Sequence, residues 1–385
     1  WGKRGKQCFT EGYLPSSYSD QYPKQLMADI VGADRDEIVF MNGCVVNLHL
    51  LMMTYYRPQG KRCKMVVEAD AFSGDLFAAE SQVNHHGLDL DSNIVRLRPR
   101  KGEALLREDD IYELIEKEGE TIAMLLLSDV QFHTGQALDM RGITNAAREK
   151  GCVVLWDIAH AVCNVEMKLN EWQVDLAAWC TYKYMNCGVG TLGVAYIRHE
   201  FRKACGLLPE LRGWWGINIK TRHAAAKHYD PSTSADMFKI SVGPWLLIAP
   251  IMTSLQIFSD MGETKRLRKQ FLLTGYLELL LIDELGASHD LEDSTRLIHL
   301  ITPRDADRRG SQLSIRLSSA YDPASVVQQL LRRGISCDVT AGSLIRFAPV
   351  APYNTFEDVY RCAQALKECF SELPSFNGVI CSNGH

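Results

Sequence analysis

Hydrophobic and polar residues alternate along the chain in a pattern that changes once, a little before two thirds of its length. From about residue 37, short apolar runs are separated by amphipathic stretches, beginning with Ile38–Phe40 and the helical Val45–Tyr55. Ile122–Leu127 is the clearest buried strand, because it is short and apolar throughout. Similar reasoning predicts strands at 65–68, 152–156, 176–179 and 192–197, and helices at 22–31, 111–118 and 143–150. Strands that alternate with helices predict a mostly parallel sheet with helices on both faces.

The pattern changes after Gly243-Pro244. One long helical stretch is predicted from about Leu246 to Leu281. Later in the sequence we predict strands at 297–302, 312–318 and 344–347 and helices at 324–333 and 355–373. A frayed tail is predicted at 374–385. This pattern is typical of a smaller α+β domain. The sequence therefore predicts an N-terminal arm (1–29), a large domain (30–255) and a small C-terminal domain (256–385).

Composition narrows the class of protein. With 385 residues, 46% hydrophobic and 23% charged, the chain fits a soluble globular protein of more than one domain. Its net charge of -5 gives no basic surface for nucleic acid, and no apolar run approaches the roughly 18 residues of a membrane helix. The 12 cysteines are scattered without zinc-ligand spacing, so we expect no metal and a cytoplasmic protein. Because the chain opens on Trp1, we also expect a preceding N-terminal piece.

The strongest local signal is an apolar run, Val153–Trp156, that ends in Asp157 and is followed by His160. The carboxyl ends of strands form the edge where open α/β sheets bind ligands. A carboxylate there can keep a pyridine nitrogen protonated, as pyridoxal phosphate (PLP) chemistry requires. Taken alone, Asp157 could equally be the N-cap of the next turn.

Lys183 strengthens this interpretation. It follows the predicted strand 176–179 and precedes Gly188 and Gly190, which is an unusual place for a surface lysine. Desolvation would make the neutral amine available to form a Schiff base. A lysine that extends from a strand edge into solvent remains the alternative. Together, Asp157 and Lys183 predict a PLP site, although either residue alone is a weak signal.

Seven short stretches then occur in the order in which a known family has them. They are 46–52 (VNLHLLM), 68–75 (EADAFSGD), 134–136 (TGQ), 157–162 (DIAHAV), 182–184 (YKY), 212–216 (RGWWG) and 345–350 (IRFAPV). On these residues nearly the whole chain resembles the kynureninases, which are PLP-dependent hydrolases of fold type I. The resemblance implies a large PLP-binding domain, a smaller C-terminal domain and a homodimer with shared active sites.

The resemblance also implies roles for single residues. Lys183 corresponds to the Schiff-base lysine, Asp157 to the partner of the pyridine nitrogen, and Phe72 to the aromatic ring stacked on the cofactor. Further implied cofactor contacts are Cys44, Val45, Asp75, Ser128, His160, Tyr182 and Trp214, the last reaching in from the other subunit. Arg346 corresponds to the arginine that pairs with the substrate α-carboxylate, a role suited to a planar bidentate donor. Without the resemblance, Phe72 and Trp214 could be ordinary core residues.

The chain departs from the family pattern at several positions. Cys44-Val45 replaces Leu-Thr, so a hydroxyl that serves the phosphate is missing while the backbone amides remain. His133 stands where a phosphate-binding tyrosine is expected. Val242 replaces an asparagine that contacts the aryl end of kynurenine, and valine cannot make that hydrogen bond. These departures predict an intact cofactor site with altered substrate recognition.

We therefore predict an enzyme that hydrolyses the Cβ–Cγ bond of kynurenine, or of a kynurenine-like aryl-carbonyl amino acid, to alanine and an anthranilate, as in tryptophan catabolism and NAD biosynthesis. Lys183 would take the Cα proton, and Tyr182 is a candidate proton donor.

Three alternatives remain open from the sequence. The first is a paralogue that acts on a modified substrate in secondary metabolism, which Val242 and His133 favour. The second is another fold-type-I reaction, such as transamination or a desulfuration for which Cys337 is a weak candidate. The third is a catalytically silent scaffold, and the presence of Lys183, Asp157 and Arg346 argues against it.

Overall fold

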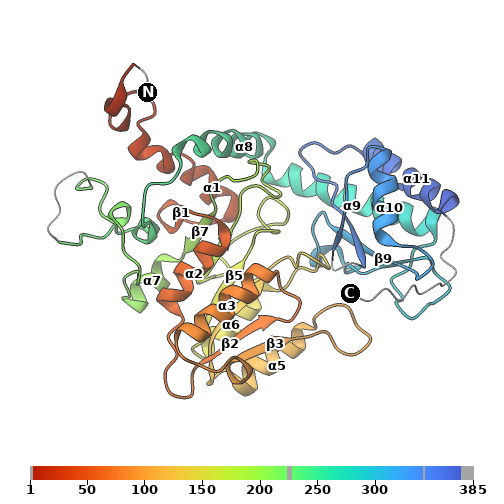
Figure 1. The fold of residues 1–385 in the computed structure, drawn as a ribbon, viewed down its shortest axis with the longest axis horizontal. Coiled ribbons are helices and arrows are strands. Elements are labelled where there is room, and N and C mark those ends of the chain that lie inside the picture. The colour runs from red at the N-terminus through yellow and green to blue at the C-terminus, as the bar shows by residue number, and fades with distance from the viewer. Residues whose placement is uncertain (1–2, 223–227, 341–342, 374–385) are drawn as a thin grey trace, which may run out of the picture. The chain divides into compact units, whose positions relative to one another are not determined.

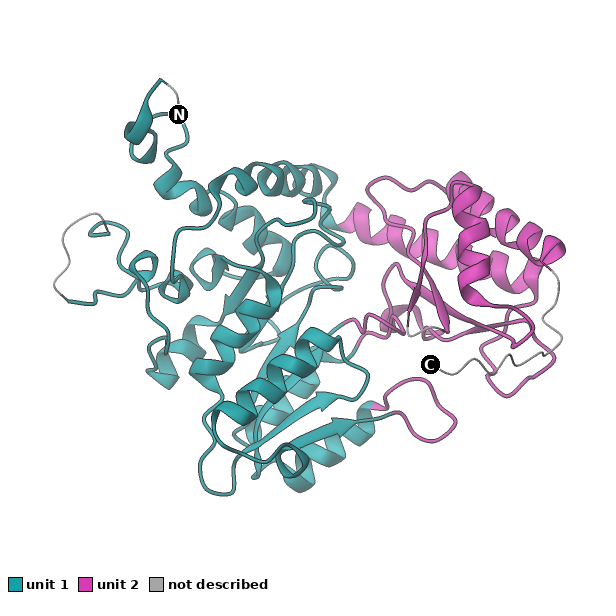
Figure 2. Cartoon of the chain, in the orientation of Figure 1, with its two compact units in different colours: residues 1–98, 108–129, 138–263 teal, residues 99–107, 130–137, 264–385 magenta. Residues whose placement is uncertain are grey.

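A computed structural model describes residues 3–222, 228–340 and 343–373, so the predicted tail at 374–385 lies outside the described residues. The chain divides into two compact units (Figure 2). The first comprises residues 1–98, 108–129 and 138–263, and the second comprises 99–107, 130–137 and 264–385. Residues 256–263 thus cluster with the first unit rather than the second, and two short earlier segments cluster with the second.

A seven-stranded sheet, in the order β1-β7-β6-β5-β4-β2-β3, forms the centre of the described part of the first unit. Its strands are β1 (Ile38–Phe40), β2 (Lys64–Glu68), β3 (Ile94–Leu97), β4 (Ile122–Ser128), β5 (Val153–Asp157), β6 (Leu176–Trp179) and β7 (Val194–Ile197). Within this sheet β7 alone runs antiparallel to its neighbours. β4 and β6 are buried along their whole length, as expected for strands covered on both faces.

Helices pack against this sheet (Figure 1). Those of the first unit are α1 (Lys24–Val31), α2 (Cys44–Tyr55), α3 (Ser73–His85), α4 (Leu90–Asn93), α5 (Glu108–Glu118), α6 (Met140–Glu149), α7 (His199–Cys205) and α8 (Ile248–Met261). Short 3-10 turns are η1 (Gly5–Phe9), η2 (Ser16–Gln21), η3 (Arg35–Glu37), η4 (Trp214–Gly216), η5 (Ala235–Phe238) and η6 (Trp245–Leu247). α2 contacts β5, β6 and β7, which places its N-terminus near the carboxyl ends of the parallel strands. Asp139 caps α6, whose Thr144 accepts a hydrogen bond from the indole of Trp156.

The second unit has a four-stranded antiparallel sheet in the order β10-β11-β9-β8. Its described elements are β8 (Ile298–Leu300), β9 (Leu313–Leu317), β10 (Asp338–Thr340), β11 (Leu344–Phe347), α9 (Glu263–Leu285), α10 (Pro323–Arg332), α11 (Phe356–Glu372) and η7 (Ala306–Arg308). Apolar residues of all three helices and of β8, β9 and β11 form one core. Asp322 caps α10, and Thr355 with Asp358 forms a capping box at the start of α11.

The predicted fold class is confirmed: a mostly parallel sheet with helices, followed by a smaller α+β part. The prediction of one continuous helix at 246–281 is wrong. Gly262 adopts φ 76° and ends α8, and α9 begins at the next residue. β3, β10 and α3 were not predicted, because two of them are short strands and the helix carries no strong apolar stripe. No helix in the described ranges is both long and apolar enough to cross a membrane.

Candidate active site

Three polar residues end three neighbouring strands of the first unit. Glu68 ends β2, Ser128 ends β4 and Asp157 ends β5, and Ser128 lies directly opposite Asp157 in the strand register. Since β2, β4 and β5 are parallel, their last residues meet at one edge of the sheet. Asp157 is thus the last residue of β5, as the sequence predicted.

The Asp157 carboxylate is held by a backbone N–H two residues further along the chain and faces the start of α2. Its Oδ1 accepts a 2.8 Å hydrogen bond from the N–H of Ala159, so the carboxylate also caps the following turn. The Sγ of Cys44 lies 4.0 Å from the same oxygen. Burial raises the pKa of the Cys44 thiol well above its usual value, and Asp157 adds to the shift. The thiol therefore stays protonated and is a weak donor to Asp157.

Lys183 and Phe72 come together although they are far apart in sequence. The Nζ of Lys183 lies 5.7 Å from the centroid of the Phe72 ring. Phe72 is 44% exposed, so it presents a face instead of filling the core. A Cβ added at Gly74 would lie 2.8 Å from both the Phe72 ring and the Val45 side chain. Gly74 therefore allows Phe72 and Val45 to pack closely at the start of α3.

Tyr182 and His160 lie beside this group. The neighbouring Cys180 thiol raises the pKa of Tyr182 most, followed by burial, and brings it to about 12. The phenol therefore keeps its proton at neutral pH, as a proton donor must. The ring of His160 meets the ring of Tyr184 edge-on at 5.7 Å.

Asp75, on the first turn of α3, completes the group. Its carboxyl is buried, and burial raises its pKa well above the usual value. Asp157 raises the pKa further through its charge and a hydrogen bond, whereas Lys183 lowers it. Oδ1 of Asp75 has no hydrogen-bond partner among the described residues. The site thus brings together Cys44, Val45, Phe72, Asp75, Ser128, Asp157, Tyr182 and Lys183, all predicted from sequence.

Sequence reasoning assigned no role to Glu68. Its side chain is only 3% exposed, and its Oε1 accepts a 2.8 Å hydrogen bond from the backbone N–H of Ser128. The signal that identified Asp157, an apolar run ending in an acid, is also present at Glu68. Glu68 was nevertheless missed because nothing local to β2 indicates how deeply its end is buried.

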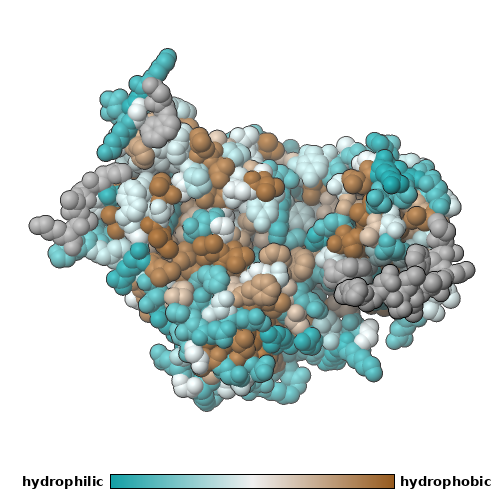
Figure 3. Space-filling model, in the orientation of Figure 1, coloured by the Kyte–Doolittle hydropathy of each residue, from teal (hydrophilic) through white to brown (hydrophobic). Residues whose placement is uncertain are grey.

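Trp214 and Val242 lie on two adjoining segments of the first unit. A Cβ at Gly213 would lie 1.8 Å from the carbonyl oxygen of Ile240, so the two backbones touch. Trp214 is 48% exposed and Val242 41% exposed, and Trp214 packs edge-on against Trp215 with ring centroids 4.7 Å apart. Neither residue is core. Figure 3 shows other hydrophobic residues at the surface of the first unit.

Arg346 and His133 belong to the second unit. Arg346 donates from Nε to Oδ1 of Asp338 at 2.8 Å and from Nη2 to Oδ2 at 2.5 Å. Its Nη1 also donates to the carbonyl oxygen of Phe132 at 2.6 Å. His133 Nδ1 lies 3.0 Å from Oγ1 of Thr340. Arg346 therefore already holds a carboxylate in the two-point geometry that its predicted role requires.

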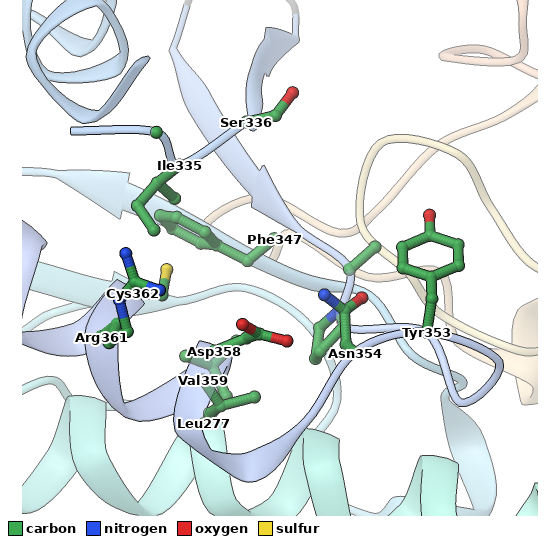
Figure 4. Close-up of a pocket in the computed structure, with 13 residues that line it drawn as sticks. Leu277, Ile335, Ser336, Phe347, Tyr353, Asn354, Asp358, Val359, Arg361 and Cys362 are labelled. Atoms are coloured by element: carbon green, nitrogen blue, oxygen red, sulfur yellow. The ribbon is translucent and has the colours of Figure 1, made fainter. Parts of the chain in front are cut away.

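The second unit also contains a cavity of about 370 Å³ (Figure 4). Ile335, Phe347 and Val359 form much of its apolar wall. Phe347 follows Arg346 on β11, and successive strand residues point to opposite faces. The cavity thus lies on the face of β11 away from the Arg346 side chain, and no predicted site residue lines it.

Cys337 has the properties of a structural thiol. Burial raises its pKa to about 12, with a further contribution from Asp338. A thiolate is therefore disfavoured. No cluster of His, Cys, Asp and Glu suited to a metal ion occurs in the described part of the chain.

The residues around Lys183 fit PLP chemically. Lys183 offers an amine, Phe72 an aromatic face and Asp157 a carboxylate. The N-cap residue of α2 is Gly43, which has no side chain to cap the helix, so the first amides of α2 are available to an anion. This donor set matches the aldehyde, ring, pyridine nitrogen and phosphate of the cofactor.

Comparisons with known proteins agree with this fit. The kynureninase C-terminal domain family matches residues 273–366, and the class-V aminotransferase family matches residues 21–211. Kynureninase of Rattus norvegicus is 42% identical over 95% of this chain and 78% of its own length. Human kynureninase is 41% identical over 98% of the chain and 80% of its own length, and that of Salinispora tropica is 42% identical over 88% and 77%.

Solved structures share the fold at much lower identity. A cysteine desulfurase from Thermococcus onnurineus superimposes with a TM-score of 0.76 at 17% identity, covering 93% of this chain and 85% of its own. The cystine C–S lyase C-DES gives a TM-score of 0.77 at 16% identity, covering 95% and 90%. At such identity these two matches establish the fold alone.

Proposed function

Because the chain belongs to the kynureninase family, we propose that it hydrolyses the Cβ–Cγ bond of kynurenine to alanine and anthranilate with PLP as cofactor. The identity to kynureninases over nearly the whole chain carries this proposal. The meeting of Lys183, Phe72 and Asp157 supports it independently. PLP supplies an electron sink for the bonds that break at the substrate.

The site residues of the first unit have different roles in the proposed reaction. Lys183 would hold the cofactor through its amine. Once the substrate's amine has displaced it, the freed Lys183 amine would take the proton from the substrate Cα. Phe72 would offer its face to the cofactor ring, and Asp157 would hold the proton on the pyridine nitrogen. Tyr182, which stays protonated at neutral pH, donates a proton after the Cβ–Cγ bond has broken. Cys44, Val45, Ser128 and His160 complete the cofactor contacts.

Arg346 binds the substrate α-carboxylate. Its bidentate pairing with Asp338 supports this role, because the same planar fork fits any carboxylate. Substrate would then take the place of Asp338. Desulfuration has little support in comparison, since the raised pKa of Cys337 disfavours a reactive thiolate.

A product assay tests the proposal directly. Purified protein reconstituted with PLP is incubated with kynurenine, and anthranilate and alanine are quantified by fluorescence and chromatography. We expect the two products in equal amounts, with Lys183→Ala as the inactive control. Formation of an oxo acid without alanine would mean transamination and would contradict the proposal.

We further propose a cytoplasmic homodimer. Half-exposed Trp214 suits a residue that completes the site of a second copy, and the cysteines of the described residues are free thiols, as in a reducing compartment. Mixing inactive Trp214→Ala and Lys183→Ala proteins tests the shared site. Exchange of subunits should restore about a quarter of the sites, because a mixed dimer has one intact site. Persistent inactivity after verified exchange would mean that Trp214 serves its own subunit.

A further inference from the structure

Glu68 is a buried acid of the candidate active site for which the proposed reaction has no use. It ends β2, is 3% exposed, and accepts a 2.8 Å hydrogen bond from the backbone N–H of Ser128. Ser128 ends β4 and lies opposite Asp157 on β5. The Glu68 carboxyl is therefore hydrogen-bonded to Ser128, which stands between β2 and Asp157.

The charged groups around Glu68 are mainly acids. Asp157 on β5, Asp70 just after β2 and Asp75 on α3 all interact with it, and Lys183 acts on Asp75. Burial raises the pKa of Glu68 to about 7. Hydrogen bonds from Ser128 lower this pKa, whereas Asp157 and Asp70 raise it. Glu68 therefore gains or loses its proton near neutral pH.

We propose that Glu68 is a positioning residue of the cofactor site, which holds the end of β4 through Ser128 and places a titratable negative charge beside Asp157 and Asp75. When ionised, Glu68 raises the pKa of neighbouring titratable groups. It thereby stabilises a nearby cation such as a protonated ring nitrogen. When neutral, it still accepts the Ser128 hydrogen bond. The two roles are separable, because one needs only the oxygen and the other needs the charge. The inference rests on the proposed function in one respect, which is that the cofactor binds at this edge of the sheet.

Two substitutions separate the roles. Glu68→Gln keeps the acceptor oxygen and nearly the same volume but removes the charge, whereas Glu68→Ala removes both. The exposed Glu116→Gln on α5 is the matched control, since it removes a carboxylate of the same type from the surface.

The first measurement uses the protein without cofactor. Glu68 has a higher pKa in the folded chain, about 7, than its ordinary value of 4.5. The folded state therefore binds more protons in that window, and the unfolding temperature of the wild type should fall as pH rises through it. Glu68→Gln should lose this contribution to the pH dependence. Over the same pH range its unfolding temperature should therefore fall by several degrees less than that of the wild type. Glu116→Gln should follow the wild type.

The second measurement uses the reconstituted protein. In Glu68→Gln the midpoint of the pH titration of the bound cofactor's visible absorbance should move to lower pH, because a nearby cation loses a stabilising negative charge. PLP affinity should change less than about threefold in Glu68→Gln and fall about tenfold or more in Glu68→Ala.

The outcomes distinguish the parts of the proposal. A Glu68→Gln protein that matches the wild type in both pH profiles would overturn the role of the charge. A folded Glu68→Ala protein that binds PLP as tightly as the wild type would overturn the positioning role. If kynurenine were not hydrolysed at all, the proposed function would fail, but the measurement without cofactor would still decide whether Glu68 titrates as proposed.

Discussion

Among the charged side chains buried in the described part of the first unit, two clusters are built on opposite principles. The first, here called the balanced cluster, consists of Asp20, Lys24, Asp236 and Lys239. Lys239 Nζ lies 2.6 Å from Asp20 and 2.5 Å from Asp236, and Lys24 Nζ lies 2.8 Å from Asp236. Two cations thus face two anions. Burial alone would raise the pKa of Asp236, but the two lysines outweigh it and lower that pKa.

The second cluster, the acidic edge, consists of Glu68, Asp75, Asp157 and Lys183. Here three carboxyls share one cation. Burial raises the pKa of both Glu68 and Asp75, and the charge of Asp157 raises it further. In this cluster ionisation of the carboxyls is resisted, whereas in the balanced cluster the two lysines favour ionisation of Asp236.

The difference separates a structural cluster from a functional one. Buried charges that are paired with opposite charges fix one arrangement of the chain, and removing one partner leaves a buried charge unpaired. An excess of one sign raises the energy of the empty site but suits a site that will receive a cation. Trp215 donates to Asp20, and Lys239 precedes Val242 by three positions, so the balanced cluster anchors the segments that carry Trp214 and Val242.

Removing the one cation of the acidic edge should have the largest effect. Lys183→Ala should reduce kynurenine hydrolysis to background and abolish cofactor that borohydride can fix to the protein, because the attachment point is lost. Circular dichroism should show an intact fold. Lys117→Ala on the exposed face of α5 should behave as the wild type. Borohydride-fixable PLP in the Lys183→Ala protein would disprove the assignment.

Breaking the balanced cluster should cost the most stability. Asp236→Asn leaves Lys24 and Lys239 with one carboxylate between them, and an unpaired buried charge typically costs about 3–5 kcal/mol. The free energy of unfolding, measured with urea on the protein without cofactor, should fall by about that amount. Glu113→Gln breaks an exposed ion pair with Lys117 and should cost less than about 1 kcal/mol. Equal effects of the two substitutions would mean that the cluster is not a structural anchor.

The two clusters also differ in how far the sequence could predict them. Asp157 and Lys183 were predictable because each stands beside an apolar strand, a signal that lies within a few residues. The pairing of Asp20 with Lys239 joins residues 219 positions apart, and nothing near either residue indicates the other. Burial of Glu68 depends on the place of β2 between β3 and β4, which is likewise a tertiary effect.

The same distinction applies to the fold. The buried strand at 122–127 was predicted nearly to its ends, because a segment that is short and apolar throughout is typical of a buried strand. The break at Gly262 was missed, since both helices around it continue the helical pattern and one glycine is tolerated in a helix. The helix ends there because Gly262 adopts a positive φ, and this φ depends on how the chain packs.

A smaller effect is expected at Val242, which follows the balanced cluster. The family resemblance places an asparagine at this position against the aryl end of the substrate. Val242→Asn should therefore raise the ratio of kcat/KM for 3-hydroxykynurenine to that for kynurenine by about tenfold, corresponding to one hydrogen bond of about 1.4 kcal/mol. Leu331→Asn, at an exposed position of α10, should leave the ratio unchanged. An unchanged ratio in Val242→Asn would show that this position does not contact the ring.

The smallest effect, and the one with the opposite sign, is expected at Asp75 of the acidic edge. Its pKa in the folded chain lies well above the ordinary 3.8, so the folded state keeps a proton that the unfolded chain releases as pH rises past about 4. Stability is therefore lost with rising pH, and Asp75→Asn, which cannot ionise, should avoid this loss. Without cofactor the variant should be about 1 kcal/mol more stable than the wild type at pH 8 and about equal to it at pH 4. Urea unfolding at several pH values measures the difference, with Asp91→Asn on the exposed α4 as control. If Asp75→Asn were instead destabilising at pH 8, as Asp236→Asn should be, the two clusters would not differ in the way that their charges indicate.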